Sequence, residues 1–282
     1  MTGFFEKFSF FSFYERTCSQ KPGTGSATGH WDLGSSKGRA IFCVIRFRRD
    51  VPAPIGRKQA IVPILLGVAS LPLSFGFTLM FGILAKIAGY NAADHSLFAQ
   101  SLLAGFFGAG LTEEIAKFLM ICVSLRMFRG TVKNVYEYIL IGAGVGFGFT
   151  LFEEFLYGFD IARILSRLVF IAAHLVFGMI MAYCLGMAKH KKINGQGSPT
   201  KEYLLAALVP VLMHTLYDAC TVFNKFLTDE NEDMQAIGLC IGLAGALAAF
   251  VLQIVVLLKC KKTAEKLCSL RLLPEESENL QI

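Results

Sequence analysis

The stretch that decides the fold covers residues 97–125 and reads LFAQSLLAGFFGAGLTEEIAKFLMICVSL. It is long enough to cross the hydrocarbon core of a bilayer, which requires about 20 consecutive apolar residues. Its centre nevertheless carries Glu113, Glu114 and Lys117. An ionisable side chain that faces lipid at mid-depth costs about 2.5 to 3.5 kcal/mol. A helix formed by this stretch must therefore turn its charged face toward other helices or a wet cavity.

Further segments of similar length and hydrophobicity occur along the chain, in which 54% of the 282 residues are hydrophobic. The six predicted spans are residues 60–85, 97–125, 135–158, 164–187, 203–226 and 235–258. The sequence therefore predicts an all-α fold, a polytopic transmembrane helix bundle with a polar site in its interior. The third span contains Gly142-x-Gly144-x-Gly146-x-Gly148, a spacing typical of close helix packing.

Loop charges predict the orientation, because lysine and arginine accumulate on the cytoplasmic side. Basic residues cluster in the segments 46–58, 126–133, 189–201 and 259–262. The opposite loops include the acidic segment 229–233, with Arg163 and Arg167 as exceptions. Both termini are therefore expected to be cytoplasmic. This asymmetry and attraction to anionic lipid account for the net charge of +6, so the expected partner is the lipid bilayer and no nucleic acid is required.

Three regions follow from this pattern. Residues 60–258 are expected to form the six-span membrane domain. Residues 1–59 are expected to be a largely disordered, basic cytoplasmic extension, and residues 259–282 a solvated cytoplasmic tail.

Ionisable residues occur in three more of the predicted spans. They form Phe149-x-x-x-Glu153 followed by Glu154, a single His174, and His214-x-x-x-Asp218. Five acids and one lysine facing lipid would cost about 15 kcal/mol in total. We therefore expect these side chains to face one another inside the bundle.

Helical spacing indicates what each group can do. Glu113 and Glu114 both reach the Lys117 side of one helix, which allows one carboxylate to stay ionised while the other takes a proton from water. The alternative is a charge-neutralised packing pair. Asp218 lies on the same face as His214 and can orient its imidazole or bind a substrate group.

His174 and the third-span acids leave alternatives open. A lone histidine can simply donate to a neighbouring carbonyl group. His174 and His214 nevertheless lie at similar depth, about 15 to 18 Å from the outer ends of their spans, so they can meet near the midplane with Glu113. Of the adjacent acids, Glu153 is expected to face the interior, because it shares a helix face with Phe149.

The motifs together resemble the PrsW family of intramembrane proteases, in the group that includes bacterial CAAX-type prenyl endopeptidases and the scaffold subunit of gamma-secretase. The matching residues are Glu113-Glu114-x-x-Lys117, Phe149-x-x-x-Glu153, His174 and His214-x-x-x-Asp218, on four consecutive predicted spans. The resemblance covers about residues 60–258. Many relatives have Asn where this chain has Glu154.

The resemblance implies an endopeptidase of the bacterial cell membrane that cuts membrane-anchored substrates, as in site-1 cleavage of anti-sigma factors. Glu113 would activate water, Glu114 and Lys117 would control its ionisation, and His174 and His214 would bind the water or stabilise the oxyanion. Phe149, Glu153 and Asp218 would support them. The expected substrate is a single-span membrane protein.

Two questions remain open at this stage. His174, His214 and Glu153 supply the ligand types of a catalytic zinc ion, but a glutamate base can also act without a metal. Other classes also remain, since proton-coupled or ion-coupled transporters place acids and histidines at the midplane, and a noncatalytic scaffold can share this architecture.

Overall fold

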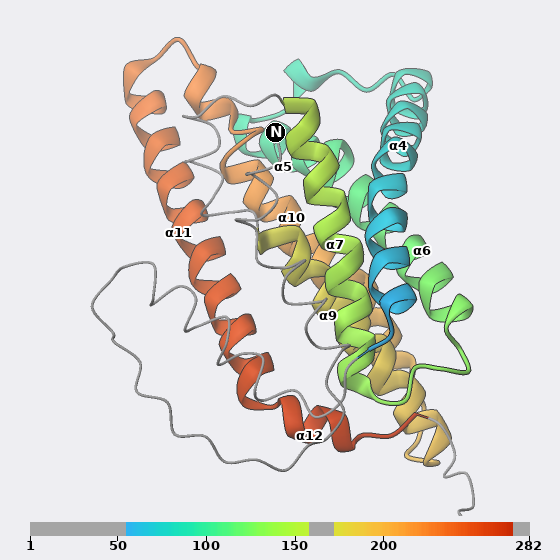
Figure 1. The fold of residues 1–282 in the computed structure, drawn as a ribbon. Helices are drawn as coiled ribbons and strands as arrows, with labels where there is room; N and C mark the ends of the chain where they lie inside the picture. Colours follow the sequence, from blue (N-terminus) through green and yellow to red (C-terminus); the bar gives the residue numbers. More distant parts are fainter. Residues whose placement is uncertain (1–54, 158–171, 273–282) are drawn as a thin grey trace, which may run out of the picture.

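The described parts of the protein, residues 55–157 and 172–272 of a computed structural model, are helical throughout apart from turns and one isolated β-bridge (Figure 1). The α-helices are α4 (Arg57–Ile87), α5 (Leu97–Gly105), α6 (Leu111–Met127), α7 (Val135–Tyr157), α9 (Ala172–Ile193), α10 (Thr200–Cys220), α11 (Glu232–Lys262) and α12 (Ala264–Ser269). Short 3₁₀ turns are Ala92–Asp94 and Lys225–Thr228, and a π turn, η2, is Phe106–Gly110. Most of the predicted 1–59 extension, the start of the fourth predicted span (164–171) and the end of the tail (273–282) lie outside the described residues.

The predicted fold class is confirmed, because the described chain is a bundle of apolar helices. Within residues 55–157 and 172–272, four helical segments are long and apolar enough to cross a membrane: α4, α7, the segment Thr200–Thr228 that begins with α10, and α11. The second predicted span is present as α5, η2 and α6, and the fourth as α9. The count of six spans remains a prediction.

The second predicted span is not the continuous α-helix that its hydrophobicity suggested. Its middle is the π turn η2, and glycines at either end of this turn contact α10. A Cβ atom on Gly105 would lie 2.8 Å from the carbonyl oxygen of Thr215, and one on Gly110 would overlap the Thr215 hydroxyl. Close packing against α10 thus coincides with the change in helix winding, and π turns are frequent at functional sites.

Helix α7 lies at the centre of the bundle, between α4 and α9 (Figure 1). Its glycines face both neighbours. A Cβ on Gly142 would overlap the Gly178 carbonyl oxygen of α9, and one on Gly148 would overlap the Ile64 carbonyl oxygen of α4. The predicted close packing is confirmed, and it brings three backbones nearly into contact.

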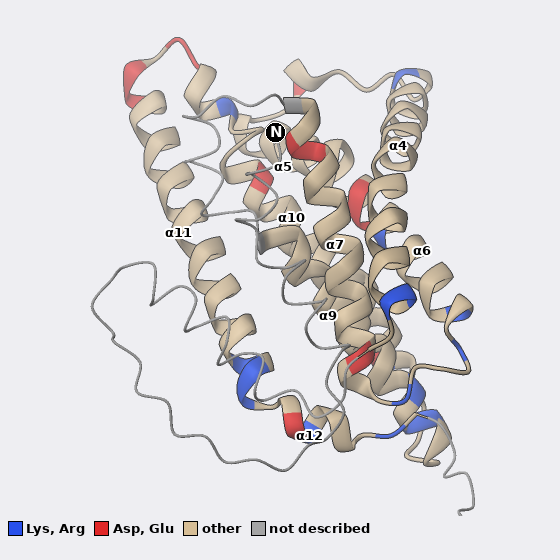
Figure 2. Ribbon diagram, viewed as in Figure 1, with Lys and Arg blue, Asp and Glu red and all other residues tan. Residues whose placement is uncertain are grey.

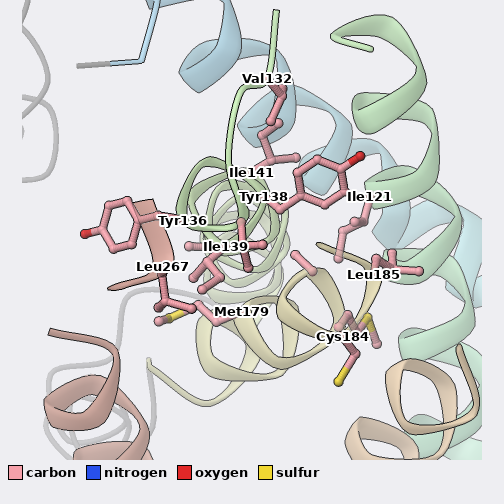
Figure 3. Close-up of a cluster of buried hydrophobic side chains, with 14 of the residues drawn as sticks. Ile121, Val132, Tyr136, Tyr138, Ile139, Ile141, Met179, Cys184, Leu185 and Leu267 are labelled. Atoms are coloured by element: carbon pink, nitrogen blue, oxygen red, sulfur yellow. The ribbon is translucent and has the colours of Figure 1, made fainter. Parts of the chain in front are cut away.

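One end of the bundle holds an apolar core formed by α6, α7, α9 and α12. Figure 3 labels its members Ile121, Val132, Tyr136, Tyr138, Ile139, Ile141, Met179, Cys184, Leu185 and Leu267. The expectation of a solvated tail is wrong for residues 264–272, because Leu267 and Leu272 are buried. The backbone of this segment also pairs with the start of α7: Val135 N donates to Leu270 O at 3.2 Å and Leu272 N to Lys133 O at 2.7 Å. The segment is short and its leucines alternate with charged and polar residues, so the sequence showed no long apolar pattern.

Basic residues gather toward one end of the bundle, whereas acidic residues occur at both ends and within it (Figure 2). Most of the basic residues lie at the end that holds the start of α4, the end of α6 and the end of α11. Acidic residues mark the connection between α10 and α11 at the other end, and further acidic segments lie within the bundle. This is the asymmetry from which we predicted cytoplasmic termini.

The start of α7 is closed by a reciprocal cap. Asn134 Oδ1 accepts a hydrogen bond from Glu137 N at 3.0 Å, while Glu137 Oε2 accepts one from Lys133 N at 2.7 Å. Asn134→Ala should lower the free energy of unfolding by about 1 kcal/mol, because the cap satisfies an otherwise unbonded helix N–H. Thermal unfolding in detergent measures the change. Gln196→Ala, in the exposed turn after α9, is the control, and an equal effect of both substitutions would contradict the prediction.

Candidate active site

The four predicted motifs meet in the interior of the bundle. Helix α6 contributes Glu113, Glu114 and Lys117, α7 contributes Phe149 and Glu153, α9 contributes His174, and α10 contributes His214 and Asp218. Ligand atoms of Glu113, Glu114, His174 and His214 all lie within 4.8 Å of one another. The prediction that these residues converge is confirmed, although their roles remain predictions.

The deepest part of the site is a charged network around Glu114. Its Oε1 lies 2.5 Å from Lys117 Nζ and 2.7 Å from His214 Nδ1. The side chains of Glu114 and Lys117 are fully buried. A carboxylate removed from water in this way needs cationic or N–H partners, and both are present. The network therefore holds Glu114 ionised and inaccessible to a substrate.

Lys117 joins this network to the other motifs. Its Nζ lies 2.8 Å from His174 Nδ1, 3.6 Å from Glu113 Oε2 and 4.1 Å from the centre of the Phe149 ring. Phe149 is itself fully buried and contacts the His174 ring, with 4.9 Å between ring centres. Phe149 thus contributes the aromatic wall that the ammonium group packs against.

The Nε2 atoms of the two histidines point toward carboxylates that lie farther from Lys117 than Glu114 does. His174 Nε2 lies 2.9 Å from Glu153 Oε2, which confirms that Glu153 faces the interior. His214 Nε2 lies 3.4 Å from Asp218 Oδ2 and 3.9 Å from Glu113 Oε2. The histidine rings are 5.1 Å apart between centres. Both imidazoles therefore link the buried network to a more accessible group of acids.

These accessible acids border a cavity of about 190 Å³. Glu113, Glu153, Glu154, His174, His214 and Asp218 line it together with Phe75, Thr78, Gly108, Ala109, Thr150, Ala173, Phe177, Tyr217, Val222 and Phe223. A single water needs roughly 15 Å³, so the cavity has room for water and part of a peptide. The wall formed by α4, η2 and the residues just after α10 was not predicted from the sequence, because most of its side chains are small or apolar and carry no chemical signature.

The residue types fit a divalent metal ion. Carboxylate oxygens and imidazole nitrogens are the ligands of catalytic zinc, and two buried oxygens, Glu113 Oε2 and Glu114 Oε2, have no hydrogen-bond partner in the described part of the chain. The ammonium group of Lys117 lies between Glu114 and His174, however, where a shared ion would have to sit. Glu113, His214 Nε2 and Asp218 lie on the cavity side, together with the carboxylates of Glu153 and Glu154.

The comparisons with known proteins agree with this site. The profile of the family described as PrsW family intramembrane metalloprotease matches residues 61–258. Similar proteins include Protease PrsW of Halalkalibacterium halodurans, 30% identical over 162 residues, with 55% of this chain and 70% of the relative covered. Protease PrsW of Shouchella clausii is 29% identical over 161 residues, covering 56% and 66%. No solved structure matches the chain. Because the profile covers well over half of the sequence, the chain belongs to the PrsW family of intramembrane metalloproteases, and it is an integral membrane peptidase.

Proposed function

We propose that this protein hydrolyses a peptide bond of a membrane-anchored protein and that Glu113 activates the attacking water. The observation that carries the proposal is the difference between the two adjacent glutamates of α6. The Glu113 side chain is 16% exposed and lines the cavity, whereas Glu114 is fully buried against Lys117. Of these two glutamates, only Glu113 can exchange a proton with a molecule in the cavity.

The reaction follows from this placement. Glu113 takes one proton from water as the water oxygen attacks the carbonyl carbon of the substrate. An N–H donor from His174 stabilises the oxyanion of the tetrahedral intermediate. The carbon–nitrogen bond then breaks, and Glu113 passes its proton to the leaving nitrogen. The products are a carboxylate and an amine, and Glu113 returns to its starting state.

The buried network keeps this base in position. Lys117 balances Glu114 and lies 3.6 Å from Glu113, so a negative charge on Glu113 is stabilised without a direct, short ion pair. Glu114 accepts from His214 Nδ1 and so orients that ring toward Asp218 and the cavity. Asp218 and Glu153 are proposed as supporting residues that hold the two histidine rings.

A divalent ion is proposed as a cofactor, held by His214 Nε2 and Asp218 beside Glu113, which stays free to act as the base; zinc is the metal that suits these ligand types best. When bound, it would supply Lewis-acid chemistry to the water and the carbonyl group. Glu153 and His174 were included in the ligand set predicted from sequence. Their contact with each other and that of His174 with Lys117 make them poorer candidates.

Metal removal should therefore lower the rate of reporter cleavage. Treatment with a zinc chelator is expected to reduce it at least 10-fold, and added zinc should restore it, because a catalytic ion contributes several kcal/mol of charge stabilisation. Metal content measured on the same samples is the matching readout. Full activity in metal-free protein would show instead that Glu113 acts without an ion.

The proposed substrate is a single-span membrane protein that enters sideways from the bilayer. The cavity is lined by Phe75, a residue of α4 that is 56% exposed, so its wall reaches the lipid-facing surface. By the resemblance to the PrsW family, we propose an anti-sigma-factor-like substrate in a bacterial cell membrane, cut near the outer half of the bilayer. Both termini of the enzyme would be cytoplasmic, in agreement with the charge asymmetry (Figure 2).

The test uses purified protein in liposomes with single-span reporters whose cut sites are placed at different depths. The native protein should cleave reporters cut in the outer half, and His214→Ala should not cleave them. His190→Ala is the matched control, because His190 lies at the far end of α9, where its Nδ1 is 3.2 Å from the carbonyl oxygen of Arg271. Equal cleavage by native protein and His214→Ala would overturn the proposal, as would cleavage of no reporter by folded native protein.

A further inference from the structure

We propose that Lys117 is a positioning residue that locks His174 in one tautomer, so that His174 acts as a hydrogen-bond donor to the substrate oxyanion and not as a base or a metal ligand. The proposal rests on the peptidase function proposed above. It deepens that function, because it separates the roles of two histidines that the sequence motifs leave equivalent.

The first step concerns the charge of Lys117. Its Nζ is 2.5 Å from Glu114 Oε1 and 3.6 Å from Glu113 Oε2, and both its own side chain and that of Glu114 are fully buried. A neutral amine here would leave a buried carboxylate with no cation beside it, which is costly in a low-dielectric interior. Lys117 is therefore an ammonium group, with three donors and no lone pair.

The second step follows from the 2.8 Å contact between Lys117 Nζ and His174 Nδ1. Because an ammonium group can only donate, Nδ1 has to accept and cannot carry a proton. The single proton of the imidazole then lies on Nε2. This nitrogen is 2.9 Å from Glu153 Oε2, a carboxylate oxygen that can accept it. The contacts on the two sides of the ring thus require the same tautomer.

His214 has the opposite arrangement at Nδ1. That nitrogen lies 2.7 Å from Glu114 Oε1, the same oxygen that accepts from Lys117. An ionised carboxylate has only lone pairs, so His214 Nδ1 carries a proton and donates it. The same nitrogen is therefore an acceptor in His174 and a donor in His214, although the two rings are in contact. The two histidines are not interchangeable.

The tautomer determines what His174 can contribute. Its ring lines the cavity, and its Nε2–H, which donates to Glu153 in the free protein, is the donor that a substrate oxyanion would share on that side. Neither nitrogen has a free lone pair, so His174 cannot take a proton from water or bind a metal ion while Lys117 is in place. A positioned donor of this kind stabilises the oxyanion of a tetrahedral intermediate and is worth about 10² to 10³ in kcat.

The test is nitrogen NMR of the full chain labelled with ¹⁵N-histidine in liposomes. The chain has five histidines, and His174→Gln identifies the signals of His174 by their loss. In the native protein, His174 should show an unprotonated Nδ1 and a protonated Nε2. A proton on His174 Nδ1 in the native protein would overturn the proposal directly, without any variant.

Two variants test the role of Lys117. Lys117→Met should leave His174 without a fixed tautomer and lower kcat by about 10² to 10³ with little change in KM, because the lost donor acts in the transition state. Lys117→Met combined with Glu114→Gln removes the charge pair together and keeps the measurement available where the single variant does not fold. Lys189→Met on α9, whose ammonium group packs on Tyr138, is the matched control and should leave the His174 signals unchanged.

The NMR spectrum tests the tautomer of His174 and the cleavage assay tests the proposed activity, so either prediction can be contradicted without the other. Cleavage by native protein with a protonated His174 Nδ1 would reject this proposal and keep the peptidase. The expected spectrum in a native protein that cleaves no reporter would reject the proposed cleavage of single-span substrates and keep the tautomer. An unchanged His174 tautomer in both Lys117 variants would show that Lys117 does not position the ring, whatever the activity.

Discussion

Glu113→Gln should reduce the kcat for reporter cleavage by about 10² to 10⁴, which is the usual contribution of a general base. Glutamine has nearly the same shape as glutamate but cannot take a proton from water. Glu113 makes only long contacts with Lys117 and His214, at 3.6 and 3.9 Å, so the substitution removes little that holds the helices together. The unfolding midpoint should change far less than the activity.

Two further variants distinguish an effect on the reaction from an effect on the stability of the fold. Glu230→Gln changes an exposed acid before α11 and should retain full activity. Glu114→Gln should behave differently from Glu113→Gln, because it breaks a buried pair and leaves Lys117 without its closest partner, at a cost of about 3 to 5 kcal/mol. Cleavage rates and thermal unfolding are measured on all three proteins. Native-like cleavage by Glu113→Gln would identify another residue as the base.

Gly146→Ala should have a large effect for a substitution of one small residue by another. A Cβ atom on Gly146 would overlap the carbonyl oxygen of His174 and lie 2.7 Å from its carbonyl carbon. Neither backbone can yield by rotating a side chain, so α7 and α9 must separate. We expect a loss of about 1 to 3 kcal/mol in the free energy of unfolding from this overpacking.

The same substitution should also lower activity, because it moves the backbone that carries His174 away from Lys117 and Glu153. Gly76→Ala on α4 is the matched control, since a Cβ there meets nothing within 4 Å. Alanine is the better helix former, so this control should be neutral or slightly stabilising. Thermal unfolding and cleavage are measured for both variants. A stable, fully active Gly146→Ala protein would contradict the close contact of α7 and α9.

Much of the site could be predicted from spacing within single helices. Residues four apart share a helix face, so the pairs Glu113–Lys117 and His214–Asp218 follow from the sequence alone. Contacts between helices could not be predicted in the same way. The approach of Lys117 to His174 depends on how two helices are rotated and shifted relative to each other, which no single-helix period contains.

The sequence by itself determined that this is a helical membrane protein, since long apolar segments in a bilayer must satisfy their backbone groups internally. It also determined which ionisable residues had to be buried together, because lipid exposure of so many charges is too costly. Only the tertiary structure decided that Glu114 and not Glu113 is sealed from the cavity, that η2 interrupts the second span and that residues 264–272 return to the core. These features arise from contacts between distant backbones, above all at glycines, and such contacts depend on the rotation and axial position of whole helices.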